Sequence, residues 1–177
     1  LMDGGPGSDI VIGGDGNDII RGSGGNDQLD GGLGNDVLDG GPGLDALMGD
    51  DGNDVLVWDF SDTIVDGGNG TDTLLVAQGN VNLTNFQGTI SGIEAIDLSV
   101  DPNSNTLTIT PQDVLDISDT DVLAVLGGGN DSIDAGSGWS YAGQNGAGQD
   151  VYTQSVGSSL ATMILDPDLI TNPDIVS

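Results

Sequence analysis

The chain has 177 residues, enough for a repeat module and one small domain, and its formal net charge at pH 7 is −28. Arg21 is its only basic residue, which argues against nucleic acid or an anionic membrane surface as a partner, because both are bound through Lys and Arg. Cys and His are absent, and no hydrophobic run reaches the roughly 18 residues of a membrane span, so the sequence excludes disulfides, the usual zinc sites and a membrane span.

A nine-residue repeat occupies residues 4–75. Its eight units read GGPGSDIVI, GGDGNDIIR, GSGGNDQLD, GGLGNDVLD, GGPGLDALM, GDDGNDVLV, WDFSDTIVD and GGNGTDTLL. Seven units have Asp at position six, namely Asp9, Asp18, Asp27, Asp36, Asp45, Asp54 and Asp72. All eight have an aliphatic residue at position eight: Val11, Ile20, Leu29, Leu38, Leu47, Leu56, Val65 and Leu74. A phase kept this strictly argues against ordinary turns and against a disordered acidic linker.

Each unit predicts a turn followed by a very short strand. The first six residues are rich in Gly, Asn and Asp, which tolerate the positive φ angles of tight turns. The last three residues would span roughly 10 Å as a strand, too short to be stable alone. We therefore expect copies to stack, with the position-eight side chains forming an internal apolar column.

The repeat resembles that of the repeats-in-toxin (RTX) family of secreted bacterial proteins, whose nonapeptide forms a calcium-binding parallel β-roll. The resemblance implies that two units make one coil, so that each unit stacks on the unit two further along. Asp residues 18 positions apart would then lie at roughly the 4.8 Å spacing of neighbouring strands. Carboxylates this close repel one another, and a hard divalent cation such as Ca²⁺ between them reverses the sign of the interaction.

The resemblance also implies the ligands of each ion. One unit would give its Asp and the carbonyl oxygens of positions two and four, and the stacked unit its Asp and the carbonyls of positions one and three. One column then holds two sites: Gly5, Gly7 and Asp9 with Gly22, Gly24 and Asp27; Ser23, Gly25 and Asp27 with Gly40, Pro42 and Asp45. The other column holds three: Gly14, Gly16 and Asp18 with Gly31, Leu33 and Asp36; Gly32, Gly34 and Asp36 with Gly49, Asp51 and Asp54; Asp50, Gly52 and Asp54 with Gly67, Asn69 and Asp72. That makes about five ions, and no full-affinity ion is expected between Asp45 and Thr63, because the unit from Trp58 to Asp66 lacks the glycines and the position-six Asp.

The rest of the chain predicts a small β-rich domain over residues 77–165. The stretches VNLTNF (81–86) and TISGIEAIDLSV (89–100) alternate in polarity, and so do residues 106–110, as expected of strands. Thr110 and Pro111 begin a predicted short helix over residues 111–117. Residues 122–126 predict a buried strand, and two or three more strands are expected over 139–165. Asp131 lies in one further copy of the repeat phase, and its binding of an isolated Ca²⁺ stays open, because Gln149 stands where the stacked Asp would be.

The segments GIEAIDL, NTLTITPQDVLDISDT and VLAVLGGGNDSIDAGSGW resemble the C-terminal region of giant RTX adhesins, which are bacterial surface proteins exported by type I secretion. This resemblance implies that residues 166–177 form a tail carrying an uncleaved signal for the exporter. No signal peptide precedes the repeat, and the chain opens within it, so we expect the C-terminal part of a longer protein.

No sequence motif for catalysis is present. GxSxG, HExxH and Cys/His pairs are missing, and the paired carboxylates are better explained as metal ligands than as a general acid and base. We therefore expect an all-β, monomeric, secreted or cell-surface protein without enzymatic activity. Its expected function is calcium-dependent folding and type I secretion at the C-terminus of a large adhesin. The alternatives are a calcium-dependent ligand- or glycan-binding module, for which Trp139 and Tyr141 are candidate sugar-stacking residues, and the RTX tail of a secreted hydrolase.

Overall fold

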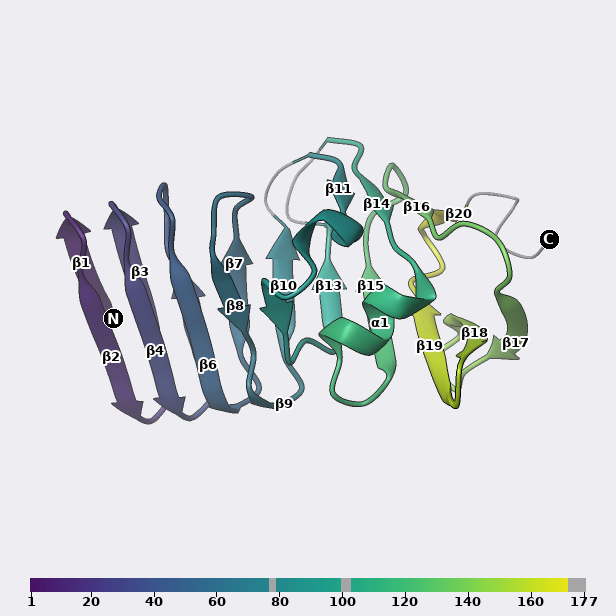
Figure 1. Ribbon diagram of the computed structural model, residues 1–177, viewed down its shortest axis with the longest axis horizontal. Helices are drawn as coiled ribbons and strands as arrows, with labels where there is room; N and C mark the ends of the chain where they lie inside the picture. Colours follow the sequence, from purple (N-terminus) through teal and green to yellow (C-terminus); the bar gives the residue numbers. More distant parts are fainter. Residues whose placement is uncertain (77–78, 100–102, 172–177) are drawn as a thin grey trace. The chain divides into compact units, whose positions relative to one another are not determined.

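Short parallel strands make up most of this computed structural model, which describes residues 1–76, 79–99 and 103–171 (Figure 1). The predicted all-β class with one short helix is confirmed. The chain divides into two compact units. The described part of the first comprises residues 1–76 and 88–93, and that of the second comprises residues 79–87, 94–99 and 103–171.

The first unit is a parallel β-roll with two sheets. The chain passes from one sheet to the other at every repeat unit, so that one coil takes two units. One sheet holds, in order, β1 (Met2–Pro6), β3 (Ile19–Gly24), β5 (Val37–Asp39), β7 (Val55–Trp58) and β10 (Thr73–Val76). The other holds β2 (Ile10–Asp15), β4 (Gln28–Leu33), β6 (Ala46–Gly52), β8 (Ile64–Asp66) and β12 (Ile90–Ser91), with β9 (Asn69–Gly70) also paired to β6. The register places Leu29 opposite Val11 and Leu47, which confirms the predicted stacking of each unit on the unit two further along.

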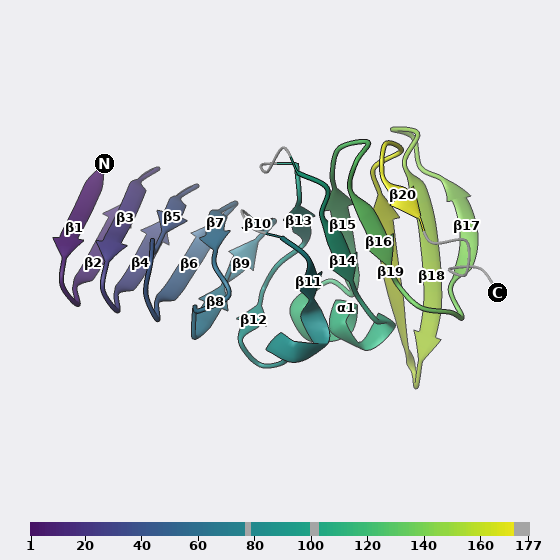
Figure 2. The same ribbon diagram turned by 90° about the horizontal axis from the view of Figure 1, so that it is seen from above.

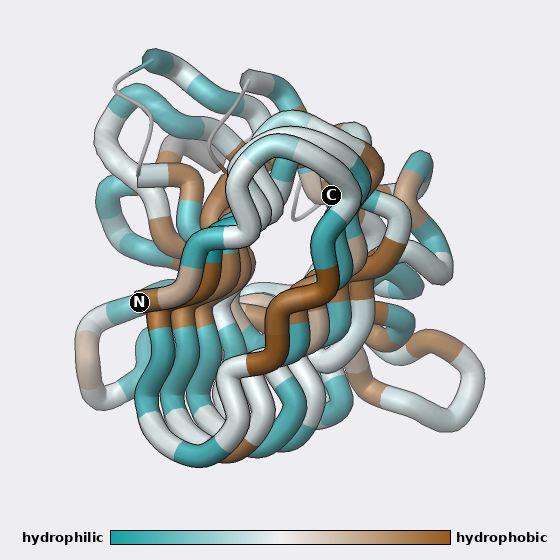
Figure 3. The backbone as a smooth tube through the Cα atoms, turned by 90° about the vertical axis from the view of Figure 1, so that its left-hand side faces the viewer, coloured by the Kyte–Doolittle hydropathy of each residue, from teal (hydrophilic) through white to brown (hydrophobic). Residues whose placement is uncertain are grey.

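The interior of the roll is the column of position-eight side chains. From the second unit onward each is completely buried: Ile20, Leu29, Leu38, Leu47, Leu56, Val65 and Leu74 are all 0% exposed. Seen along the roll, the hydrophobic segments of successive coils lie one behind another (Figure 3). Burying an aliphatic side chain of this size contributes about 1.5–3 kcal/mol, but each unit offers only one such residue, so the apolar interior alone supplies little per residue.

The seventh repeat unit departs from the regular coil. Trp58 extends β7, is 1% exposed and lies opposite Val76 of β10. The chain then turns through residues 59–62 and re-enters the other sheet as β8. The next coil is longer, because β12 pairs with β8 at an offset of 25 residues. Residues 88–93 thus belong to the first unit, although the sequence boundary at residue 76 assigned them to the second domain.

The second unit also contains parallel strands, with longer connections between them. Strands β11 (Val81–Asn82), β14 (Thr106–Thr108), β16 (Ser132–Asp134) and β20 (Ile170–Thr171) form one parallel sheet. Strands β13 (Ala95–Asp97), β15 (Val122–Leu126) and β19 (Ser159–Leu165) run parallel (Figure 2). Strand β18 (Asp150–Val156) pairs antiparallel with β19, and β17 (Ser140–Gln144) pairs antiparallel with β18.

Two local predictions in this unit have different outcomes. The helix α1 (Pro111–Ile117) is confirmed, and it begins with a capping box in which Thr110 and Asp113 bond each other's backbone N–H groups. The strand predicted over VNLTNF is mostly wrong, because only Val81 and Asn82 pair as β11, and Leu83–Phe86 form a 3₁₀ helix, η1. The Asn82 side chain accepts a hydrogen bond from the Thr84 N–H at 3.1 Å, and this cap favours the helical turn over a longer strand.

The C-terminal tail is described only in part. Leu169 is 8% exposed, and β20 pairs with β16. The remainder of the predicted secretion signal, residues 172–177, lies outside the described residues. Within the described ranges, no helix is long and apolar enough to cross a membrane.

Candidate metal centre

The turns between strands are held in register by hydrogen bonds between stacked coils. The N–H of position four donates to the carbonyl of position three in the stacked unit: Gly16 N–H to the Leu33 carbonyl at 2.6 Å, and Gly34 N–H to the Asp51 carbonyl at 2.8 Å. A carbonyl oxygen has two lone pairs, so these oxygens keep one for a cation. The position-three carbonyls are therefore still able to serve as predicted ligands.

The position-six Asp carboxylates lie between stacked coils and use their two oxygens differently. One oxygen, Oδ1, accepts the N–H of the Asp 18 residues earlier. The distance from the donating N to the accepting Oδ1 is 2.8 Å for Asp9 to Asp27, 2.7 Å for Asp18 to Asp36, 2.8 Å for Asp27 to Asp45, and 2.7 Å for both Asp36 to Asp54 and Asp54 to Asp72. The second oxygen, Oδ2, is buried and lacks a hydrogen-bond partner in Asp9, Asp27, Asp36, Asp45 and Asp54. A buried carboxylate oxygen without a donor is costly, so this arrangement calls for a cation.

The glycine at position one leaves room for such a cation. A Cβ added at Gly31 would lie 2.6 Å from Asp36 Oδ2 and 2.8 Å from the carbonyl oxygen of Gly49 in the stacked coil. The same pairing of an Asp Oδ2 with a carbonyl from the stacked coil recurs beside Gly4, Gly13, Gly22 and Gly49. In all five places the two atoms belong to one predicted ligand set, so the residues present fit the implied Ca²⁺.

Electrostatics favour the same conclusion. Burial, together with repulsion from the carboxylates of Asp72 and Asp36, raises the pKa of Asp54 to about 6, although the hydrogen bond from the Asp36 N–H opposes this shift. Burial likewise raises the pKa of Asp45, with repulsion from Asp27 contributing. Without a bound cation, these carboxylates therefore resist full ionisation.

The donor set consists of oxygen only. Within the described residues, no group of three or more His, Cys, Asp or Glu side chains is close enough to hold a metal ion. Each predicted site instead brings together two carboxylates, and backbone carbonyls would supply the rest. Carboxylate and carbonyl oxygens are the ligands that Ca²⁺ prefers, and six to eight of them are usual.

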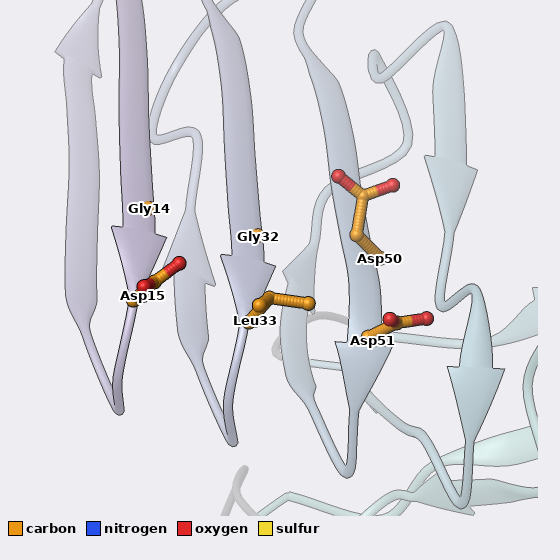
Figure 4. A pocket seen from close by; sticks show the side chains of 6 residues that line it. All are labelled: Gly14, Asp15, Gly32, Leu33, Asp50 and Asp51. Atoms are coloured by element: carbon orange, nitrogen blue, oxygen red, sulfur yellow. The ribbon is translucent and has the colours of Figure 1, made fainter.

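A shallow pocket lies over the turns of one column (Figure 4). Its volume is about 380 Å³, and it is lined by positions two and three of three stacked units: Gly14, Asp15, Gly32, Leu33, Asp50 and Asp51. Three of these positions, Gly14, Gly32 and Asp50, require unusual backbone geometry or space. For example, Asp50 has φ 70°, and a Cβ at Gly32 would meet the Gly14 carbonyl. The pocket thus belongs to the turns that carry predicted carbonyl ligands.

The sequence prediction missed Asp62. The predicted register is present, since Thr63 donates its N–H to the Asp45 carbonyl at 2.8 Å. The carboxyl group near Asp45, however, is that of Asp62, one position earlier. Asp62 is 6% exposed, and burial raises its pKa to about 7, with repulsion from Asp59 and Asp45 adding to the effect and the N–H groups of the same two residues opposing it. An Asp displaced by one position in the unit that lacks the regular Asp is the signal that could have identified it.

Asp131 is hydrogen-bonded within the protein. Its Oδ2 accepts the Gly128 N–H at 2.7 Å and its Oδ1 the Asn105 N–H at 3.0 Å. Gln149, 18 residues further on, bonds Asn145 instead. Asp131 is only 2% exposed, and these hydrogen bonds to both carboxylate oxygens explain how it can be buried without a bound ion.

The candidate sugar-stacking pair is not formed. Trp139 is 2% exposed and donates its Nε1–H to the Ala135 carbonyl at 3.0 Å. Tyr141 is exposed and lies against Tyr152, with ring centroids 5.4 Å apart. Burial of Trp139 therefore leaves Tyr141 without the predicted second stacking surface.

Comparison with known proteins agrees with this geometry. Residues 3–38, 24–56, 62–83 and 125–139 match the family described as RTX calcium-binding nonapeptide repeat (4 copies), and together they cover more than half of the chain. A search of curated proteins finds no match. RTX nonapeptide repeats bind calcium, and proteins that carry them are typically secreted. With its eight repeat units stacked as a parallel roll around buried Asp carboxylates, the chain belongs to the RTX calcium-binding nonapeptide repeat family.

Proposed function

We propose that this chain is a calcium-dependent folding and type I secretion module at the C-terminus of a large bacterial surface adhesin, without enzymatic activity of its own. The proposed calcium dependence rests on five buried Oδ2 atoms that lack hydrogen-bond partners. Each belongs to a position-six Asp of one of the two columns. About five ions, held by the ligand sets given above, would neutralise them. The adhesin and exporter parts rest on the resemblance of the segments between residues 92 and 139 and of the tail.

Calcium concentration would decide when the roll folds. Extracellular calcium modules typically have Kd values on the order of 10⁻⁴–10⁻³ M, far above cytosolic calcium. Inside the cell the sites stay empty, carboxylate repulsion keeps the chain unfolded, and an exporter can thread it. Outside, each filled site stabilises the fold by RT ln(1 + [Ca²⁺]/Kd). The absence of Cys fits this role, because no disulfide can form early and block passage.

Circular dichroism tests the calcium part directly. The spectrum of the chain in EDTA should be that of a largely disordered roll, and several millimolar Ca²⁺ should restore the strand signal. Mg²⁺ at the same concentration is the control, because it requires near-ideal octahedral geometry and gives up its waters reluctantly. A roll already folded in EDTA would contradict the proposal.

Truncation of the tail tests the export part. Removing residues 172–177 leaves every strand described here in place, including β20, whereas removing residues 166–177 also deletes β20 and the buried Leu169. The shorter deletion should abolish export from cells that carry a type I exporter and leave calcium-induced folding of the purified chain unchanged. Export at the normal level would reject the tail as the signal.

A further inference from the structure

The seventh repeat unit, residues 58–66, lacks the position-six Asp, yet it places a buried carboxylate beside Asp45. We infer that Asp45 and Asp62 form a sixth, irregular calcium site. This inference rests on the proposed calcium-driven folding and adds a site that the repeat pattern does not assign.

Asp45 contributes one unpartnered oxygen. Its Oδ1 accepts the Asp27 N–H at 2.8 Å, while its Oδ2 is buried without a hydrogen bond. In the regular columns the next Asp would stand 18 residues later, but Thr63 occupies that place. The N–H and hydroxyl of Thr63 both donate to the Asp45 carbonyl, at 2.8 and 2.9 Å. Thr63 therefore fixes the stacking of the two coils but supplies no negative charge.

Asp62 contributes the second unpartnered oxygen, and the turn holds it rigidly. Its N–H donates to the Asp59 carbonyl at 3.3 Å, and its Oδ2 accepts the Asp59 N–H at 3.0 Å. Its other oxygen, Oδ1, is buried without a hydrogen bond. Asp62 directly precedes Thr63, and both the carboxylate and the backbone N–H of Asp45 lie close enough to influence it. Two stacked units thus each present one buried, unpartnered carboxylate oxygen, as in the regular sites.

Nothing in the protein supplies a compensating positive charge. Arg21 is the only basic side chain of the sequence. It lies in β3, opposite Asp3 of β1 and Asp39 of β5, and not in the sheet that contains β6 and β8. Asp59 adds a second negative charge to the turn that carries Asp62, although its Oδ1 already accepts the Ser61 N–H at 2.6 Å. Trp58 and Phe60 stand at positions one and three of this unit, and the turn is closed by its own hydrogen bond from the Asp62 N–H to the Asp59 carbonyl. Ca²⁺ accepts variable oxygen geometry, completed by carbonyls or water, which makes it the fitting cation.

The competing explanation is a proton on Asp62, and substitution separates the two. Asp62→Asn removes the charge but keeps an acceptor for the Asp59 N–H, so it reproduces a protonated Asp62. Asp59→Asn is the matched control, because it removes one charge from the same turn and keeps an acceptor for the Ser61 N–H. The bound ions of the full chain are counted by native mass spectrometry in saturating Ca²⁺, with folding checked by circular dichroism.

Six ions in the unmodified chain and in Asp59→Asn, with five in Asp62→Asn, support the sixth site. Asp45→Asn should lose two ions, because Asp45 would serve this site and the regular site with Asp27, whereas a loss of one ion would overturn the inference. Five ions in the unmodified chain, or an unchanged count in Asp62→Asn, would also overturn it while leaving the proposed function intact. If Asp62→Asn does not fold, the count in the unmodified chain decides. A chain that binds no ions would reject the proposed function as well.

Discussion

Substituting Asp36 by Ala should damage the roll far more than substituting Asp9 by Ala. Asp36 is 1% exposed, its Oδ1 accepts the Asp18 N–H at 2.7 Å, and its own N–H donates to Asp54 at 2.7 Å. It belongs to two predicted sites, one with Asp18 and one with Asp54. Asp9 is only half-buried, lies in the first repeat unit and belongs to one predicted site, with Asp27.

The difference can be estimated from these contacts. In about 10 mM Ca²⁺, a site with Kd on the order of 10⁻⁴–10⁻³ M contributes roughly 1.4–2.7 kcal/mol to the free energy of unfolding. Asp36→Ala removes two sites, and it also removes a hydrogen bond to a charged acceptor, which contributes about 1.5–3 kcal/mol. Its total cost is then roughly 4–8 kcal/mol, against roughly 1.4–2.7 kcal/mol for Asp9→Ala.

Two measurements check this estimate. Calorimetric titration should show two ions lost in Asp36→Ala and one in Asp9→Ala, and urea unfolding in calcium should rank the two variants in the same order. Asp36→Asn keeps an acceptor for the Asp18 N–H, so its difference from Asp36→Ala isolates the hydrogen bond. Equal losses of calcium from Asp36→Ala and Asp9→Ala would refute the sharing of inner carboxylates between successive sites.

Three further predictions concern the glycines beside the Asp carboxylates, the pH dependence of folding and the binding of glycans. Gly31→Ala should lower the calcium stoichiometry, because its Cβ would lie 2.6 Å from Asp36 Oδ2. Gly24→Ala, whose Cβ meets nothing within 4 Å, should change the free energy of unfolding by no more than about 0.5 kcal/mol. Calorimetry and urea unfolding of both variants test this difference. In EDTA the roll should become more folded as the pH falls from 8 toward 5. The folded-state pKa values of Asp54 (about 6) and Asp62 (about 7) lie above the ordinary Asp value of 3.8, so protonation favours the folded chain, and this stability is lost as the pH rises through those values. In calcium the trend should reverse, because protons compete with Ca²⁺ for the same carboxylates, and circular dichroism across this range would reject the reasoning if both series ran in the same direction. On a glycan array in millimolar calcium we expect no specific signal, because Trp139 is buried, and a reproducible hit would favour the ligand-binding alternative.

The periodic part of the fold could be predicted because its information is local and repeated. The aliphatic residue at position eight of every unit predicted an internal column, and the stacking of units two apart, implied by the RTX resemblance, aligns Asp27 with Asp9 and Asp45. Glycine occurs at position one because a Cβ there would fill the space beside the Asp carboxylate. The phase of the repeat thus predicted the interior, and together with the two-unit coil implied by the RTX resemblance it predicted the register and the positions of the Asp side chains.

The irregular parts depend on contacts that phase does not encode. Asp62 was missed because its place beside Asp45 is set by the turn hydrogen bonds with Asp59, not by its position in the repeat. Residues 88–93 join the first unit through pairing with β8, an offset that the nine-residue period does not contain. In VNLTNF, alternation predicted a strand, but the Asn82 cap favoured a helical turn.

The irregular outermost strand of the second unit, β17, has a consequence for many copies held at high local concentration. Strands β13, β15 and β19 run parallel, β18 is antiparallel to β19, and β17 is antiparallel to β18. The pairing of β17 with β18 shifts register between Tyr141 and Gly143. A sheet that ended on a straight parallel strand would offer its free N–H and C=O groups to the coil of another molecule. Here the outermost strand, β17, is short and its pairing is bulged, so it is a poor template for a further parallel coil. The same hairpin that completes this sheet thus protects the protein against edge-to-edge polymerisation from that side.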